Sequence, residues 1–222
     1  MSELIKDNEV LEDLQYNDLC IIQEKDGYRF TSDAVALANF VKLNRSSTLV
    51  DLCSGSGIFG ILTHYKNKAR NTILVELQES LADMSFRTLQ YNGSLDIQVV
   101  NADLKGVHKT IGAGCYDAVT CNPPYKKAGT THKLNEKETI TIAKHEITVT
   151  LEDIVKEASA LLKFGGDFYT VNKEERLADL IVLCRKYNLE PKELKILNNS
   201  KSAKVFLLKA KKGGKSGMTI SL

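Results

Sequence analysis

Apolar runs of strand length alternate with helical segments along most of this chain, and this alternation limits the fold more than any other feature. Strands that alternate with helices pair in parallel, because each helix carries the chain back across the sheet. The last two apolar runs are joined by a short link of hairpin length, which predicts one antiparallel edge strand. The sequence therefore predicts an α/β fold with a mostly parallel seven-stranded sheet and helices on both faces.

The predicted elements follow from hydrophobic period and turn signals. The strands are expected at residues 49–53, 73–77, 97–100, 117–121, 167–171, 193–198 and 204–210, and the main helices at 58–65, 79–91, 151–164 and from 177 onward. The third helix begins with a capping-box pattern at Thr150 and Asp153 and is expected to end at Gly165-Gly166. A long polar stretch, residues 126–149, precedes this helix, and loops of that length are usually functional.

A glycine loop follows the first predicted strand. Gly55, Gly57 and Gly60 fit the pattern G-x-G-x-x-G, and Glu76 ends the next strand roughly 20 residues further on. Such glycines allow a tight turn and close approach of a ligand, while the acid binds ribose hydroxyls. The pattern predicts a nucleotide-type cofactor. The alternative is a plain tight turn, with Glu76 as a solvated strand end.

The acids at the strand ends favour one kind of cofactor. Asp51 places a carboxylate beside the glycine loop, where it would repel a pyrophosphate, which prefers a positive site. S-adenosylmethionine has no phosphate, and its methionine end carries a sulfonium and an ammonium group. We expect Asp51 to meet this cationic end and Glu76 to bind the ribose. Asp103, after the third strand, can accept a hydrogen bond from the adenine amino group.

The fourth strand stops abruptly at Asn122-Pro123-Pro124-Tyr125. Two successive prolines make a stiff, extended loop. The Asn122 side-chain oxygen and the Pro123 carbonyl can converge as two acceptors on a planar NH₂ group, and Tyr125 can stack on the flat group that carries it. This arrangement suits in-line methyl transfer by positioning, with Asn122, Pro123 and Tyr125 as the catalytic residues. A plain turn with a structural tyrosine is the alternative.

Four motifs in order, DLCSGSG, LVELQ, NAD and NPPY, resemble those of class I S-adenosylmethionine-dependent methyltransferases. The resemblance covers about residues 28–212 and implies a Rossmann-like methyltransferase fold. It adds Leu77, Ala102 and Asn122 to the cofactor site. One departure is Cys53, where the usual pattern has glycine. We expect residues 1–45 to form an N-terminal segment that packs on a methyltransferase domain of residues 46–222.

The NPPY motif is shared by enzymes that methylate exocyclic adenine amines in nucleic acid and by enzymes that methylate a glutamine amide in release factors. Only about 45 residues precede the glycine loop, too few for the helical domain of the release-factor enzymes. Three segments resemble bacterial valine-tRNA adenine methyltransferases, which modify the adenine beside the anticodon. These segments are residues 27–37, residues 143–146 and residues 208–215. That resemblance implies that Phe30 and Thr31 lie near the methionine end of the cofactor.

Basic side chains around the predicted site fit an RNA partner. Lys126, Lys127, Lys144 and His145 are the candidate substrate contacts, together with Pro124 of the motif. Lysines neutralise phosphates, and an anticodon-loop adenine is already partly unstacked, so it turns into a pocket at little cost. Each lysine taken singly also fits a solvated surface. The chain carries a net charge of +2, which by itself names no partner.

Five cysteines without C-x-x-C spacing argue against a disulfide frame and a zinc site, and for a reducing compartment. No apolar signal core and no membrane-length run is present. We therefore expect a cytoplasmic protein without a metal or membrane partner, as a monomer or a weak dimer. The function predicted is methyl transfer from S-adenosylmethionine to an adenine amino group in tRNA. The alternatives are a glutamine-amide methyltransferase, a non-catalytic RNA-binding protein and an NAD-dependent oxidoreductase, against which Asp51 argues.

Overall fold

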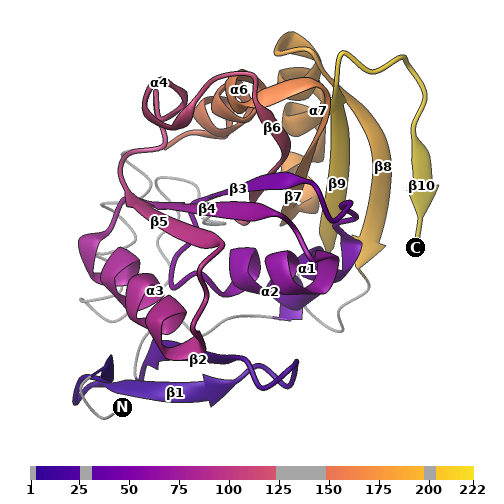
Figure 1. The fold of residues 1–222 in the computed structure, drawn as a ribbon. Helices are drawn as coiled ribbons and strands as arrows, with labels where there is room; N and C mark the ends of the chain where they lie inside the picture. The colour runs from indigo at the N-terminus through magenta and orange to yellow at the C-terminus, as the bar shows by residue number, and fades with distance from the viewer. Residues whose placement is uncertain (1–3, 26–31, 124–148, 198–203) are drawn as a thin grey trace.

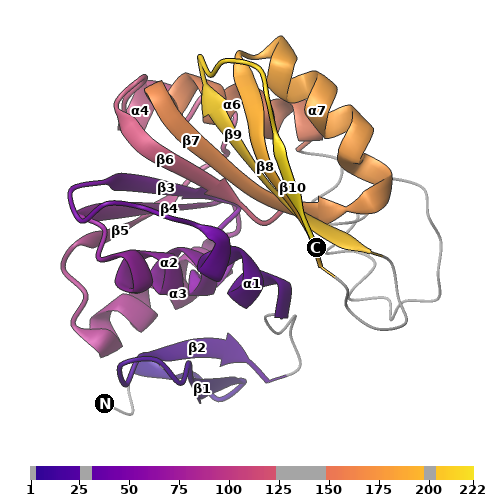
Figure 2. The same ribbon diagram turned by 90° about the vertical axis from the view of Figure 1, so that its right-hand side faces the viewer.

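The computed structural model describes residues 4–25, 32–123, 149–197 and 204–222 of the chain. In this part, one sheet of eight strands is covered by helices on both faces, and a two-stranded hairpin lies outside one helical layer (Figures 1 and 2). The sheet strands are β3 (Thr48–Leu52), β4 (Asn71–Glu76), β5 (Ile97–Asn101), β6 (Tyr116–Cys121), β7 (Leu162–Lys173), β8 (Leu189–Leu197), β9 (Val205–Lys212) and β10 (Thr219–Ser221).

The order of strands in the sheet is β10-β8-β9-β7-β6-β3-β4-β5. Strands β3 to β7 are mutually parallel, which confirms the predicted α/β class. Two details differ from the prediction. Short β10 adds an eighth strand beside β8, and the antiparallel strand β9 lies between β7 and β8 rather than at an edge. Hairpin spacing predicts that β8 and β9 are antiparallel neighbours, but it does not indicate which of them is the inner strand.

Two helical layers cover the sheet. The helices are α1 (Ser32–Phe40), α2 (Ile58–Asn67), α3 (Glu79–Asn92), α4 (His108–Ile111), α6 (Leu151–Leu161) and α7 (Leu177–Lys186), with a 3₁₀ turn η2 (Glu174–Arg176) before α7. One core joins α6 and α7 to the sheet through residues such as Val155, Leu180 and Phe168. On the opposite face, α1 and α2 pack on the sheet through residues such as Leu37 and Leu62.

The boundary between α6 and β7 differs from the prediction. Helix α6 has the expected capping box, in which the Thr150 hydroxyl accepts a hydrogen bond from the Asp153 backbone N–H. The helix ends at Leu161 instead of continuing to residue 164, and β7 already begins at Leu162, which pairs with Tyr116. Gly165 lies in an irregular part of the strand with φ of 81°. An apolar pair such as Leu161-Leu162 fits a helix end and a buried strand equally well.

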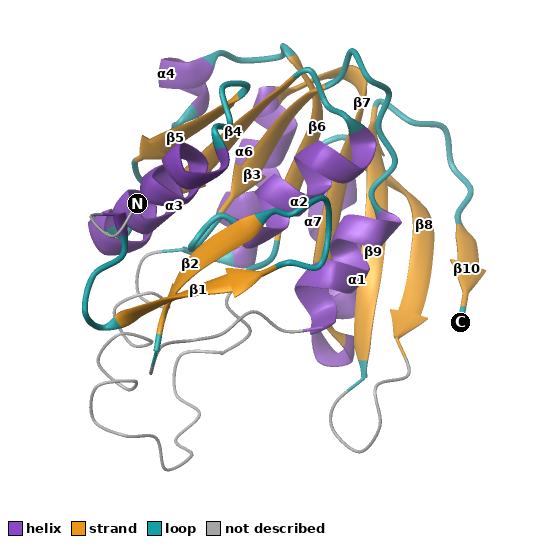
Figure 3. Ribbon diagram, turned by 60° about the horizontal axis from the view of Figure 1, so that its bottom comes forward, coloured by secondary structure: helices purple, strands orange, loops and turns teal. Residues whose placement is uncertain are grey.

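The N-terminal hairpin consists of β1 (Glu9–Asp13) and β2 (Cys20–Glu24), and it packs on α3 (Figure 3). Side chains of α3 satisfy the open edge of β2: the Ile22 N–H donates to Thr88 Oγ1 at 3.1 Å, and Asn92 bonds both backbone groups of Cys20. A covered edge is protected from pairing with other chains.

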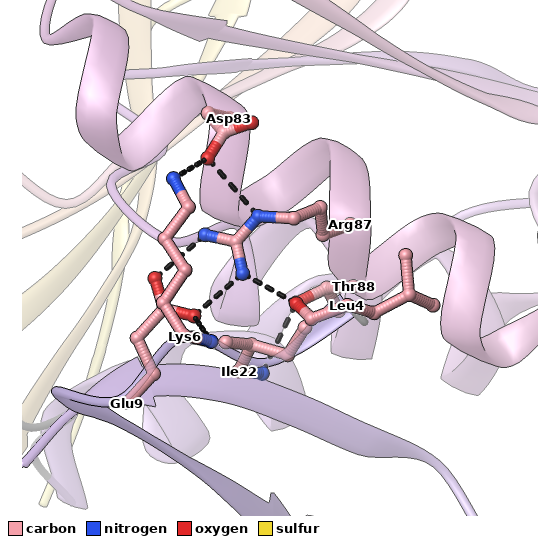
Figure 4. A network of polar contacts seen from close by, with 7 residues as sticks. All are labelled: Leu4, Lys6, Glu9, Ile22, Asp83, Arg87 and Thr88. Carbon is pink, nitrogen blue, oxygen red and sulfur yellow. Dashed lines mark hydrogen bonds and ion pairs between the residues drawn. The ribbon is translucent and has the colours of Figure 1, made fainter. Parts of the chain in front are cut away.

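A buried ion pair fixes the same hairpin (Figure 4). The Arg87 guanidinium donates to both carboxylate oxygens of Glu9 at 2.5 and 2.6 Å and to Asp83 at 3.0 Å. The side chains of Arg87 and Glu9 are only 9% and 3% exposed. Burial raises the pKa of the Glu9 carboxyl, but hydrogen bonds from Arg87 and from the Lys6 backbone outweigh it, and the pKa is lowered overall.

Candidate active site

The carboxyl ends of β3, β4, β5 and β6 meet at one edge of the sheet. Leu52 at the end of β3 is opposite Val75 of β4 on one side and Cys121 of β6 on the other, and Glu76 is opposite Asn101 of β5. Three of the segments predicted to form a site therefore converge: the glycine loop, the strand end with Glu76 and the Asn122-Pro123 segment. Ligands of open α/β sheets bind at this edge.

The glycine loop needs glycine at two positions for different reasons. Gly55 has φ of 58°, and a Cβ added there would face open space, so the backbone is exposed to an incoming ligand. A Cβ at Gly60 would lie 2.3 Å from Leu74 Cδ2, so this glycine lets α2 pack directly on β4. Gly57 has φ of 86° and is the N-cap residue that precedes α2. The three positions match the turn, approach and packing roles of a nucleotide-binding loop.

Glu76 holds the glycine loop in place. One carboxylate oxygen accepts the Gly55 N–H at 2.8 Å and the other accepts the Gln78 N–H at 2.9 Å, while the residue is 4% exposed. Each carboxylate oxygen has further lone pairs for a ligand hydroxyl. The alternative interpretation, in which Glu76 is a solvated strand end, is therefore wrong.

The segment after β5 lies against the end of β4. The Asn101 side-chain amide donates to the backbone carbonyls of Glu76 and Leu77 at 2.9 and 3.0 Å, and the Ala102 N–H donates to the Glu76 carbonyl. Leu77 is 40% exposed, and Asp103 accepts the Lys105 N–H while its side chain stays 40% exposed. The structure thus brings Leu77 and Ala102 next to Glu76. The accessible carboxylate of Asp103 follows Ala102 directly.

Asp51 lies deeper than the sequence suggests. The residue is 1% exposed, its Oδ1 accepts the Thr120 hydroxyl at 2.8 Å, and its Oδ2 lies against Gly60. The pKa of Asp51 is raised to about 8, chiefly by burial and also by the charge of Glu76, while hydrogen bonds from the Thr120 hydroxyl and the Gly60 backbone N–H act in the opposite direction. Near neutral pH the buried group is mainly protonated, and a nearby cation would favour its ionised form.

Asn122 and Pro123 follow β6 directly; Asn122 is half-buried and Pro123 is buried. The other predicted site residues lie outside the described residues. These are Phe30, Thr31, Pro124, Tyr125, Lys126, Lys127, Lys144 and His145. In the described ranges, no group of three or more His, Cys, Asp or Glu side chains is arranged to hold a metal ion. No helix in these same ranges is long and apolar enough to cross a membrane.

Residues 31–182 match the family model of the methyltransferase small domain, which is more than half of the chain. The chain belongs to this family. A tRNA1(Val) (adenine(37)-N6)-methyltransferase of Aliivibrio salmonicida is 24% identical over 141 residues, which cover 63% of this chain and 58% of the relative. One of the same name from Shewanella frigidimarina is 26% identical over 168 residues, which cover 73% and 66%. The chain thus matches less than two thirds of the length of either relative.

Solved structures agree on the fold of this methyltransferase family member. A predicted O-methyltransferase from Agrobacterium tumefaciens has a TM-score of 0.66 at 22% identity, with 85% of each chain covered. A geranyl diphosphate C-methyltransferase from Streptomyces coelicolor, in complex with S-adenosyl-L-homocysteine, has a TM-score of 0.60 at 14% identity, with 94% of each chain covered. At these identities the likeness shows the Rossmann-like methyltransferase fold alone.

The departure at Cys53 affects the glycine loop of this family member. Cys53 has φ of 57°, a left-handed conformation that favours glycine, and its side chain is half-buried. Its thiol contacts that of Cys121, and the pKa of the Cys121 thiol is raised chiefly by burial and also by this contact. The loop therefore keeps the backbone shape of a glycine at a position occupied by a larger residue.

Three residues at this edge were missed by the sequence analysis. Ser85 of α3 is fully buried, and its hydroxyl donates a hydrogen bond to the Gly55 carbonyl at 3.0 Å. This bond helps to hold the glycine loop in place. The Ser54 hydroxyl and the Asn172 amide nitrogen are buried and have no hydrogen-bond partner in the described part of the chain. The sequence carries a signal for Asn172, because this polar residue directly follows the mainly apolar strand segment Phe168–Val171. Ser85 gives no such signal, since its role depends on tertiary packing.

Proposed function

We propose that this chain transfers a methyl group from S-adenosylmethionine to the exocyclic amino group of an adenine in tRNA, beside the anticodon. The observation that carries the proposal is the position of Asn122-Pro123 at the end of β6, next to β3 and its glycine loop. In this proposal, Asn122 and Pro123 supply two acceptors for an NH₂ group beside a loop suited to a nucleotide-type ligand.

The residues of the loop fit the proposed cofactor. The backbone at Gly55 faces open space, the Ser54 hydroxyl is an unused buried polar group, and the Glu76 carboxylate retains lone pairs for a ribose diol. Asp51, buried and protonated, would be favoured in its ionised form by the cationic methionine end. The remaining proposed cofactor contacts are Phe30, Thr31, Gly57, Leu77, Ala102, Asp103 and Asn122. The family membership and the S-adenosyl-L-homocysteine complex of a fold neighbour support this assignment.

When bound, S-adenosylmethionine supplies an electrophilic methyl group on a sulfonium sulfur. The role of the protein is to position the amine. Asn122 and Pro123 accept its two hydrogens, which frees the nitrogen lone pair for attack, and Tyr125 stacks on the base. No strong base is needed, because the amine loses its proton after the nitrogen has attacked.

The choice of tRNA adenine over a glutamine amide rests on the relatives. The curated relatives are named for adenine methylation in a valine tRNA. We assign Pro124, Lys126, Lys127, Lys144 and His145 to the RNA contact, and we place the reaction in the cytoplasm. We also propose that residues 1–45 form a segment packing on the methyltransferase domain of residues 46–222; the contacts of Arg87, Thr88 and Asn92 with the hairpin support this division. A monomer or weak dimer stays a prediction.

The test is transfer of a labelled methyl group by the purified protein to unmodified tRNA and, in parallel, to a release factor. We expect tRNA to be labelled in its adenine and the release factor to stay unlabelled. Asn122→Ala should lose most of the transfer even at a concentration of S-adenosylmethionine that saturates the variant. Labelling of the release factor alone, or near-normal turnover of the Asn122→Ala variant, would overturn the proposal.

A further inference from the structure

The end of β7 carries a polar group that neither the cofactor loop nor the NPPY motif explains. Asn172 is 5% exposed, and its side-chain nitrogen has no hydrogen-bond partner in the described part of the chain. Its neighbours in the strand are apolar or engaged: Val171 is fully buried in the core, and the Thr170 hydroxyl donates to a backbone carbonyl. A buried amide without a partner costs about 1–3 kcal/mol.

The sheet register places this group at the proposed substrate site. Cys121, the last residue of β6, is opposite Thr170 of β7, and β7 continues two residues further to Asn172. Asn172 therefore lies beside the start of the Asn122-Pro123 segment, on a strand about 5 Å away. Its side chain shares the face of Phe168 and Thr170, because side chains two apart in a strand point the same way. On its other side, the backbone of Asn172 pairs with Phe206 of β9.

The chemistry of the free group defines what it can recognise. A side-chain NH₂ is a donor, and donors need an acceptor with a lone pair. Asn122 and Pro123 are proposed to accept the two hydrogens of the target amine. The atoms next to that amine on an adenine are ring nitrogens, N1 on one edge and N7 on the other, and both are acceptors.

We propose that Asn172 contacts the substrate by donating a hydrogen bond from Nδ2 to the ring nitrogen beside the target amine. This inference rests on the proposed adenine methylation and adds a residue that reads the base. Two acceptors for the amine and one donor for the adjacent ring nitrogen match adenine, and they also match the amino edge of cytosine. Guanine and uracil, which carry a carbonyl oxygen in place of the amine, cannot satisfy the two acceptors.

The first test uses Asn172→Leu, which keeps the branched outline of the side chain and removes the unused donor. Because a buried unsatisfied group is lost, we expect unchanged or higher thermal stability and unchanged affinity for S-adenosylmethionine. The kcat/KM for tRNA should fall about 10- to 100-fold, the loss expected for one hydrogen bond in a dry site. Thr63→Val is the matched control, since Thr63 in α2 is fully buried and its hydroxyl also lacks a partner in the described ranges. This control should keep full transfer.

The second test changes the base instead of the protein. An anticodon stem–loop carries adenine, 1-deazaadenine or 7-deazaadenine at the methylated position. We expect one of the two analogues to lower the rate of the wild-type protein about 10- to 100-fold, and to cause no additional loss in Asn172→Leu.

The outcomes separate this inference from the proposed function. Absence of any transfer by the wild-type protein to tRNA would refute the function itself. Transfer by the wild type together with full activity of Asn172→Leu, or with equal rates on adenine and both analogues, would overturn the role of Asn172. Since the analogue comparison in the wild-type protein needs no variant, it decides the question even if Asn172→Leu does not fold.

Discussion

Asp51 is an acid held in a nearly dry position behind the glycine loop. Its pKa of about 8 in the folded protein lies above the unfolded value of 3.8, so the folded state binds the proton more tightly between these values. Stability associated with this group is therefore present at low pH and is lost as the pH rises toward 8. The same proton should leave when a cationic ligand binds near the carboxylate.

We predict that the wild-type protein loses stability relative to Asp51→Asn as the pH rises from about 4 to about 8. Asparagine has the same shape and cannot ionise, so other titrating groups cancel in the comparison. Urea unfolding of both proteins at several pH values measures the difference. A difference in the free energy of unfolding that does not change with pH would show that Asp51 does not titrate in this range.

Cys53 carries the strain of a left-handed residue, since its φ is 57°. Such a conformation costs about 1–2 kcal/mol for a residue with a Cβ, whereas glycine adopts it freely but loses more entropy on folding. We predict that Cys53→Gly raises the free energy of unfolding by about 0.5–1 kcal/mol. Cys53→Ala is the control: it removes the thiol but keeps the Cβ, so it should bring no such gain. Equal effects of the two substitutions would contradict the argument from strain.

Among the elements, the β1–β2 hairpin depends on a buried ion pair with α3. We predict that Arg87→Met destabilises the protein by about 3–5 kcal/mol, because Glu9 is left buried and uncompensated. Lys6→Met is the control, since the Lys6–Asp83 pair is exposed, and it should cost at most about 1 kcal/mol. Urea unfolding measures the loss of stability in each variant, and hydrogen exchange of the Ile22 amide measures the protection of the hairpin. Equal losses in both variants would mean that burial of the pair is unimportant.

Helix α6 depends on its first turn. Thr150 and Asp153 exchange hydrogen bonds in a complete capping box. We predict that Thr150→Val lowers the free energy of unfolding by about 1 kcal/mol and leaves the affinity for S-adenosylmethionine unchanged, because the cap lies outside the cofactor loop. Calorimetry and ligand titration test both parts. A stability within error of the wild type would show that the cap is dispensable.

Across the fold, the sequence predicts the parts that local pattern determines. The parallel strands β3 to β7 and the position of Glu76 beside the glycine loop follow from hydrophobic period and motif spacing. The inner position of β9, the early start of β7 and the hairpin β1–β2 depend on pairing between distant residues, which no local period encodes. For the same reason Asp51 was expected at the rim, whereas tertiary packing buries it between Gly60 and Thr120.

Nucleoside mass spectrometry tests the proposed modification of an adenine amino group in tRNA. Total tRNA is isolated from wild-type cells and from cells in which the gene is deleted, and it is digested to nucleosides. Deletion cells complemented by the wild-type protein or by Asn122→Ala are analysed in the same way. We predict that N6-methyladenosine in tRNA is lost on deletion, restored by the wild type and not restored by Asn122→Ala. An unchanged level of N6-methyladenosine after deletion, or full restoration by Asn122→Ala, would contradict the proposal.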